Sequence, residues 1–237
     1  MERTYKKWRS PSLGIDMELL VFGSSGTPVL AFPTGEGRFY EWENEGLIDA
    51  LSLQLENGYN QLFCVDTVDE ESFFNADVNP YTRLMRHEQY EAYILEEVLP
   101  YIRSFNNRNF LITAGIGFGG YHASNLALKH PRKFQKLISI NASYNIKPFM
   151  DDFYDKNVYF NNPVDYLSNL NDPDIIRVIN QTDIRLITEP SSETHGEVKH
   201  LSTILNERFI DHQLDIWDET KVEEPGQWGD ILLKHIV

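Results

Sequence analysis

Short apolar runs alternate with longer amphipathic stretches along this chain, and this alternation limits its fold more than any other feature. Several of the runs, such as 62–65, are apolar throughout, which is typical of strands buried on both faces. Strands that alternate with helices predict a mostly parallel sheet between two helix layers, that is, a three-layer α/β/α sandwich. The predicted strands are Met17–Phe22, Val29–Pro33, Gln61–Asp66, Phe110–Ala114, Lys136–Asn141, Arg185–Thr188 and Gln213–Trp217.

The amphipathic stretches place their apolar residues on one face at helical spacing. They predict helices over Glu45–Glu56, Leu84–Phe105, Tyr121–Lys129, Thr194–Asn206 and Gln227–His235. The segment 145–183, rich in Asn, Asp, Tyr and Pro, interrupts the alternation. We expect it to be an insertion that passes over the carboxyl ends of the strands, where α/β sheets bind ligands. A single domain over 1–237 accounts for the length.

Charge and composition exclude several classes of partner and site. The net charge is −15, and so acidic a surface repels nucleic-acid phosphates. No apolar run reaches the roughly 18 residues of a membrane span, and none follows the basic segment Met1–Ser10 as a signal peptide requires. The single cysteine, Cys64, cannot form an internal disulfide. We therefore expect a cytoplasmic protein with neither nucleic acid nor membrane as a partner.

The stretch 110–123 joins a buried strand to a helix through a glycine-rich turn. This arrangement is typical of a nucleophile elbow, which needs small residues two before and two after its apex because strand and helix approach closely there. Gly115 and Gly119 occupy the flanking positions, and Gly117 occupies the apex. Glycine tolerates the strained backbone of the apex, but it has no side chain to act as a nucleophile.

Several segments in order resemble a bacterial esterase family of the α/β-hydrolase superfamily. They are 32–41, 61–66 with 70–72, 87–100, the glycine elbow, 159–163 and 217–228, so the resemblance covers nearly the whole chain. It implies the α/β-hydrolase fold and a Ser-His-acid mechanism. In this chain, however, Gly117 stands at the serine position and Glu223 at the histidine position, with no histidine between His212 and His235. Glu193 is the candidate for the acidic residue of the triad.

A chain without the attacking hydroxyl and its base has no route to covalent acyl transfer. The leading hypothesis is therefore a catalytically degenerate hydrolase that binds a small molecule or a protein partner through the old cleft. Oxyanion donors would come from the amide of Phe118 and from the Thr34-Gly35 turn. Arg38, Tyr121 and Glu223 would lie around the rim.

Two other hypotheses stay open. In the first, Glu223 or Glu193 acts as a general base on water, giving hydrolysis without an acyl-enzyme. In the second, the protein has a structural role, for example as a homo-oligomer, and the cleft is irrelevant.

Other motifs are weaker. Gly115, Gly117 and Gly120 fit a dinucleotide fingerprint, but the next predicted strand carries no acid to hold a ribose, so no cofactor is expected. His195 and His200 lack zinc-site spacing, and no metal is expected. We expect His122 and Ser124, on the helix after the elbow, to pack or hydrogen-bond locally and not to replace the missing serine.

Overall fold

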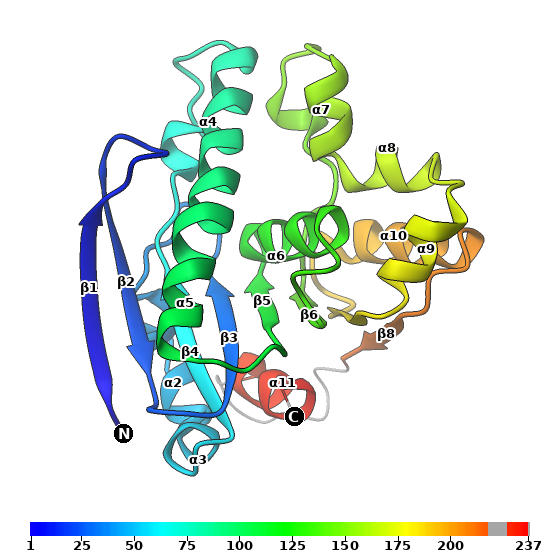
Figure 1. Cartoon of the computed structure of the whole chain (residues 1–237). Helices are drawn as coiled ribbons and strands as arrows, with labels where there is room; N and C mark the ends of the chain where they lie inside the picture. Colours follow the sequence, from blue (N-terminus) through cyan, green and yellow to red (C-terminus); the bar gives the residue numbers. More distant parts are fainter. Residues whose placement is uncertain (218–226, 237) are drawn as a thin grey trace.

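The computed structural model describes residues 1–217 and 227–236, and within them eight strands form one sheet (Figure 1). The strand order is β1-β2-β4-β3-β5-β6-β7-β8. The β2 strand runs antiparallel to both of its neighbours, and all other pairs are parallel. The strands are β1 (Arg3–Arg9), β2 (Asp16–Phe22), β3 (Thr27–Phe32), β4 (Asn60–Val65), β5 (Ile112–Ile116), β6 (Lys136–Ile140), β7 (Asp183–Thr188) and β8 (Gln213–Ile216).

Helices cover both faces of the sheet. One face carries α4 (Pro80–Tyr93), a π-helical turn η2 (Ile94–Val98), α5 (Leu99–Phe105), α6 (Phe118–Lys129) and α10 (His195–Glu207). The other carries α1 (Glu41–Asn44), α2 (Leu47–Ala50), α3 (Ser52–Glu56) and α11 (Gln227–His235). The predicted three-layer α/β sandwich with a mostly parallel sheet is confirmed.

Successive residues of a central strand enter different cores, because side chains alternate across a sheet. In β3, Leu30 packs into the core under α4 to α6, and Val29 into the core under α1 to α3 and α11. In β4, Phe63 likewise packs into the core under α4 to α6, and Cys64 into the core on the opposite face. This double burial explains why these strands are apolar throughout. Burial also raises the pKa of the Cys64 thiol, which leaves it unreactive.

Each predicted strand corresponds to an observed one, although the run predicted at Phe110–Ala114 is a strand at Ile112–Ile116 and Phe110 is exposed. The strand β1 was not predicted from the sequence. This edge strand pairs with β2 alone, and most of its side chains are exposed, so it has no apolar run. Its Trp8 makes the main inward contact, with the indole N–H donating to Glu97 at 2.8 Å.

The predicted helices are present, but two are interrupted. The stretch predicted at Glu45–Glu56 divides into α2 and α3 at Leu51, and the one predicted at Leu84–Phe105 contains the π-helical turn. The apolar faces are as predicted, because Leu47, Leu55 and Val98 are all buried. None of the helices in the described residues is long and apolar enough to cross a membrane.

The segment 145–183 contains a 3₁₀ turn η3 (Lys147–Phe149) and the short helices α7 (Lys156–Asn161), α8 (Pro163–Ser168) and α9 (Pro173–Ile179). Polar caps and prolines start these helices. Asp155 and Asp172 accept hydrogen bonds from the first-turn amides of α7 and α9, and Pro163 opens α8. That this segment is an insertion over the strand ends stays a prediction.

Candidate active-site cleft

The turn between β5 and α6 has the backbone of a nucleophile elbow. Gly117, between the last residue of β5 and the first of α6, has φ 58° and ψ −124°, a conformation that other residues rarely adopt. Its amide donates to the carbonyl of Ile140 at 2.9 Å, and its carbonyl accepts from Gly120 at 3.0 Å. The strained apex is therefore fixed on both sides by backbone hydrogen bonds.

The glycines of the turn differ in the space around them. A Cβ at Gly115 would overlap the carbonyl of Gly119, and one at Gly119 would overlap the carbonyl of Pro33. A Cβ at Gly117 would meet only the Cβ of Thr34, at 4.0 Å. Close backbone packing thus requires the flanking glycines, whereas the apex has open space for a side chain.

The loop after β3 contains the Thr34-Gly35 turn, from which one oxyanion donor was predicted. The amide and hydroxyl of Thr34 both donate to the carboxylate of Glu41, each at 2.6 Å. The Thr34 amide is therefore occupied, which leaves Gly35 as the candidate donor of the predicted Thr34-Gly35 turn. Within the described residues, the amides of Gly35 and Phe118 have no hydrogen-bond partner. These two remain as candidate oxyanion donors.

Aromatic side chains adjoin these two amides. The Phe74 ring lies so close to Gly35 that a Cβ there would be 2.9 Å from it, and its centroid is 4.9 Å from that of Phe118. Phe149, from η3, lies 5.2 Å from Phe74 and 5.4 Å from Phe118. Phe74 and Phe149 are partly exposed. This group of aromatic side chains was not predicted from the sequence, although Phe73-Phe74 is an aromatic pair within a polar stretch.

Arg38 lies beyond the same loop, where its charge is already compensated. Its guanidinium donates to both carboxylate oxygens of Asp66, at 2.6 and 2.9 Å, and to Glu18 at 2.9 Å. Burial raises the pKa of Asp66, and the ion pair with Arg38 opposes that shift. Arg38 therefore neutralises a buried carboxylate, and its place on the rim of a ligand cleft stays a prediction.

We expect Arg38→Gln to destabilise the protein by about 1–3 kcal/mol at neutral pH, because it leaves the buried Asp66 carboxylate unpaired. The loss should shrink as the pH falls and Asp66 becomes protonated. Urea unfolding at several pH values measures both effects. Arg177→Gln is the matched control, since Arg177 and its partner Asp174 are mostly exposed and their pair contributes at most about 0.5 kcal/mol. Equal effects of the two substitutions would contradict this account of Arg38.

Tyr121 and His122, near the start of α6, face inward. Tyr121 is fully buried, and its hydroxyl donates to the carbonyl of Asn161 at 2.8 Å. A fully buried side chain does not fit the predicted position of Tyr121 on the rim of the cleft. His122 is buried with its Nε2 2.8 Å from the carboxylate of Asp69. His122 was expected to pack or hydrogen-bond locally, but its partner Asp69 is 53 residues away in the sequence.

The acidic residue of a triad is predicted in the loop after β7, and the strand register shows where that loop begins. Ile116, Ile140 and Ile187 are paired across β5, β6 and β7, so the residues that follow them leave the sheet side by side. Glu189 directly follows β7, and its amide donates to the Asn141 side chain at 3.0 Å. The sequence-derived candidate Glu193 lies farther along and is exposed.

Glu189 is thus the carboxylate nearest the strand end, a residue that the sequence analysis passed over in favour of Glu193. Glu223, the residue at the histidine position, lies outside the described residues. Within the described part of the chain, no three His, Cys, Asp or Glu side chains are grouped to hold a metal ion.

Comparison with solved structures places this geometry in a known fold. A ferulic acid esterase superposes with a TM-score of 0.77 at 14% identity, covering 98% of this chain and 95% of the esterase. S-formylglutathione hydrolase FrmB from Staphylococcus aureus superposes with a TM-score of 0.68 at 15% identity, covering 99% of this chain and 95% of the hydrolase. An S-formylglutathione hydrolase from Agrobacterium tumefaciens superposes with a TM-score of 0.70 at 13% identity, covering 98% of this chain and 93% of that enzyme.

No protein-family model matches the sequence, and neither does any curated protein. At identities of 13–15%, the structural likeness establishes the fold and not the activity. The chain has an esterase-like α/β-hydrolase fold.

Proposed function

We propose that this protein is a catalytically degenerate α/β-hydrolase that binds a small molecule through the cleft around Gly117. The observation that carries the proposal is the apex itself: the strained backbone of an elbow is present, but its residue has no hydroxyl. Acyl transfer through a covalent intermediate needs a nucleophile at this point. Neither His122 nor Ser124 can replace it, because both are buried.

The remaining groups favour a ligand that carries a carbonyl oxygen beside an apolar body. The amides of Gly35 and Phe118 supply donors, and Phe74 and Phe149 supply aromatic contact area. The Glu41 carboxylate, held by Thr34 next to these donors, disfavours an additional negative charge. We therefore expect a neutral carbonyl compound to bind better than the matching carboxylate.

An active hydrolase with a glutamate general base is the alternative. The position of Glu189 at the end of β7, on the same strand edge as Gly117, favours it over a purely structural role. In this mechanism the carboxylate would take a proton from a water that attacks a carbonyl held by Gly35 and Phe118. Glu223 and Glu193 are the other candidate bases from the sequence.

Aryl-ester hydrolysis and labelling by a serine-directed fluorophosphonate test the proposal. We expect no covalent label and no burst, and a rate of at most about 10³–10⁴ over water, the level left by oxyanion groups alone. Fast turnover that the fluorophosphonate stops would overturn the proposal. Fast turnover that resists it, and that Glu189→Gln or Glu223→Ala removes, would establish the general-base alternative.

A further inference from the structure

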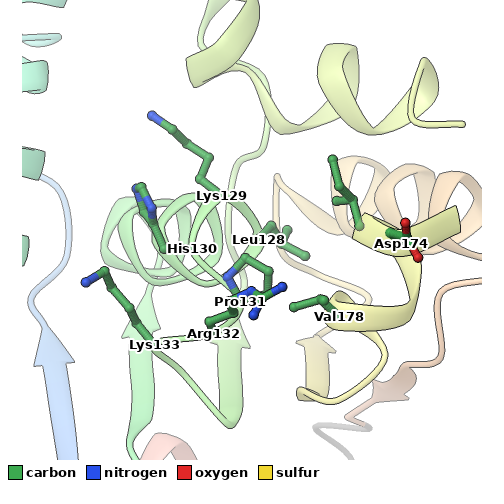
Figure 2. Close-up of a pocket in the computed structure, with 9 residues that line it drawn as sticks. Leu128, Lys129, His130, Pro131, Arg132, Lys133, Asp174 and Val178 are labelled. Atoms are coloured by element: carbon green, nitrogen blue, oxygen red, sulfur yellow. The ribbon is translucent and has the colours of Figure 1, made fainter. Parts of the chain in front are cut away.

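A second cavity lies at the opposite end of α6 from Gly117 (Figure 2). Its volume is about 400 Å³, within the range of about 300–1,000 Å³ that small-molecule sites occupy. One wall is the end of α6 and the turn that follows it, and the other wall is α9. Because α6 has 12 residues, its two ends are about 18 Å apart. This cavity is therefore separate from the candidate cleft.

The facing walls are apolar. Leu128 and Pro131 line one side, and Ile175 and Val178 line the other. Ile175 is 45% exposed and belongs to none of the buried hydrophobic clusters of the described residues. An apolar side chain that keeps this much surface on a cavity wall gains free energy when a ligand covers it.

The same cavity concentrates positive charge in a chain whose net charge is −15. Its four basic residues lie at the end of α6 and in the turn that follows: Lys129, His130, Arg132 and Lys133. Two of these bases share one acid. Lys129 and His130 both contact Glu91. Burial would raise the pKa of Glu91, but the hydrogen bond from His130 and the charge of Lys129 lower it to about 2.

Arg132 and Lys133 are the two bases of this turn without an ion pair to a described residue, and Arg132 is the one that faces α9. It is exposed and forms no ion pair with any described residue. Figure 2 shows Lys129, His130 and Lys133 extending away from α9, whereas Arg132 lies on the side that faces it. The acid on the opposite wall, Asp174, is paired with Arg177 at 2.8 Å. Arg132 thus places an uncompensated guanidinium beside the apolar walls.

We propose that this cavity binds an organic carboxylate with an aliphatic body, whose carboxylate pairs with Arg132 and whose chain lies between Pro131 and Ile175. A guanidinium suits this role because its planar donors match a carboxylate. Four apolar side chains, with one guanidinium on the side that faces α9, select for a molecule that is apolar over most of its length.

Octanoate, octanol and octylamine share an apolar chain and differ in charge, so together they test both parts of the proposal. We expect octanoate to shift the backbone amide resonances of 128–133 and 174–178 in ¹⁵N-labelled protein. We expect octanol to bind about tenfold more weakly and octylamine more weakly still, since one charge-assisted hydrogen bond accounts for about a factor of ten. Octanol binding as tightly as octanoate would overturn the proposal, as would shifts confined to other residues.

Two substitutions separate charge from shape. Arg132→Gln should weaken octanoate binding about tenfold and leave octanol binding unchanged. Ile175→Asp should weaken both ligands. Arg103→Gln, at an exposed arginine of α5 outside the cavity, is the matched control and should change neither. If Arg132→Gln binds octanoate like wild type, the proposal is wrong. Thermal unfolding of each variant shows that the fold is retained.

Discussion

Gly119→Ala should abolish stable folding, whereas Gly117→Ala should leave the protein folded. A Cβ at Gly119 would overlap the carbonyl of Pro33 and lie 2.7 Å from that of Phe32. The Phe32 and Pro33 backbone has little room to retreat, because β3 is paired with β5 from Val29↔Ile112 to Phe32↔Gly115 and Pro33 follows directly. The cost should be comparable with the whole folding free energy of a domain, about 5–15 kcal/mol.

Gly117→Ala has a different cost. Its Cβ would enter open space, so only the φ of 58° is unfavourable, at about 1–3 kcal/mol. Soluble yield, far-UV circular dichroism and urea unfolding distinguish these outcomes. Gly196→Ala is the control for a glycine in α10 with no atom near its Cβ, and it should stabilise the protein slightly. A Gly119→Ala protein that unfolds like wild type would contradict the proposed packing of the elbow.

The sequence predicted the features of this fold that depend on local pattern. The central strands are apolar throughout because both faces are buried, and that pattern is visible in Leu62 to Val65 without any tertiary information. The elbow was predictable for the same reason, since the spacing of Gly115, Gly117 and Gly119 reflects contacts within one turn. The exposed edge strand β1 lacks a local pattern, and it was missed.

The surroundings of the elbow depend on pairs that are distant in the sequence. Arg38 and Asp66 are 28 residues apart, and only the pairing of β3 with β4 brings their loops together. Either residue of the Thr34-Gly35 turn could have supplied the predicted donor, because nothing in the sequence shows that Glu41 takes the Thr34 amide. Tyr121 was expected at the rim because helical spacing alone does not tell which face of α6 is buried.

Restoring both lost groups should have the largest effect on activity. Gly117→Ser combined with Glu223→His should raise aryl-ester hydrolysis by at least about 100-fold over wild type, a fraction of the roughly 10⁶ that a complete triad contributes. The backbone of the apex already has elbow geometry, and the space beyond its Cβ is open. A serine hydroxyl at 117 would therefore point into the cleft near the free amides of Gly35 and Phe118.

Gly117→Ser alone should change the rate little, because a serine without a base remains a weak nucleophile and triad residues act as a unit. Glu223→His alone should also leave the rate of ester hydrolysis unchanged, since it supplies a base with no hydroxyl to activate. The fluorophosphonate then distinguishes the four proteins, and only the double variant should be labelled. Equal labelling of Gly117→Ser and the double variant would show that a base other than residue 223 serves the apex. Such a base would have to come from the carboxylates at the strand edge, with Glu189 first among them, and the chain would then lack only its hydroxyl.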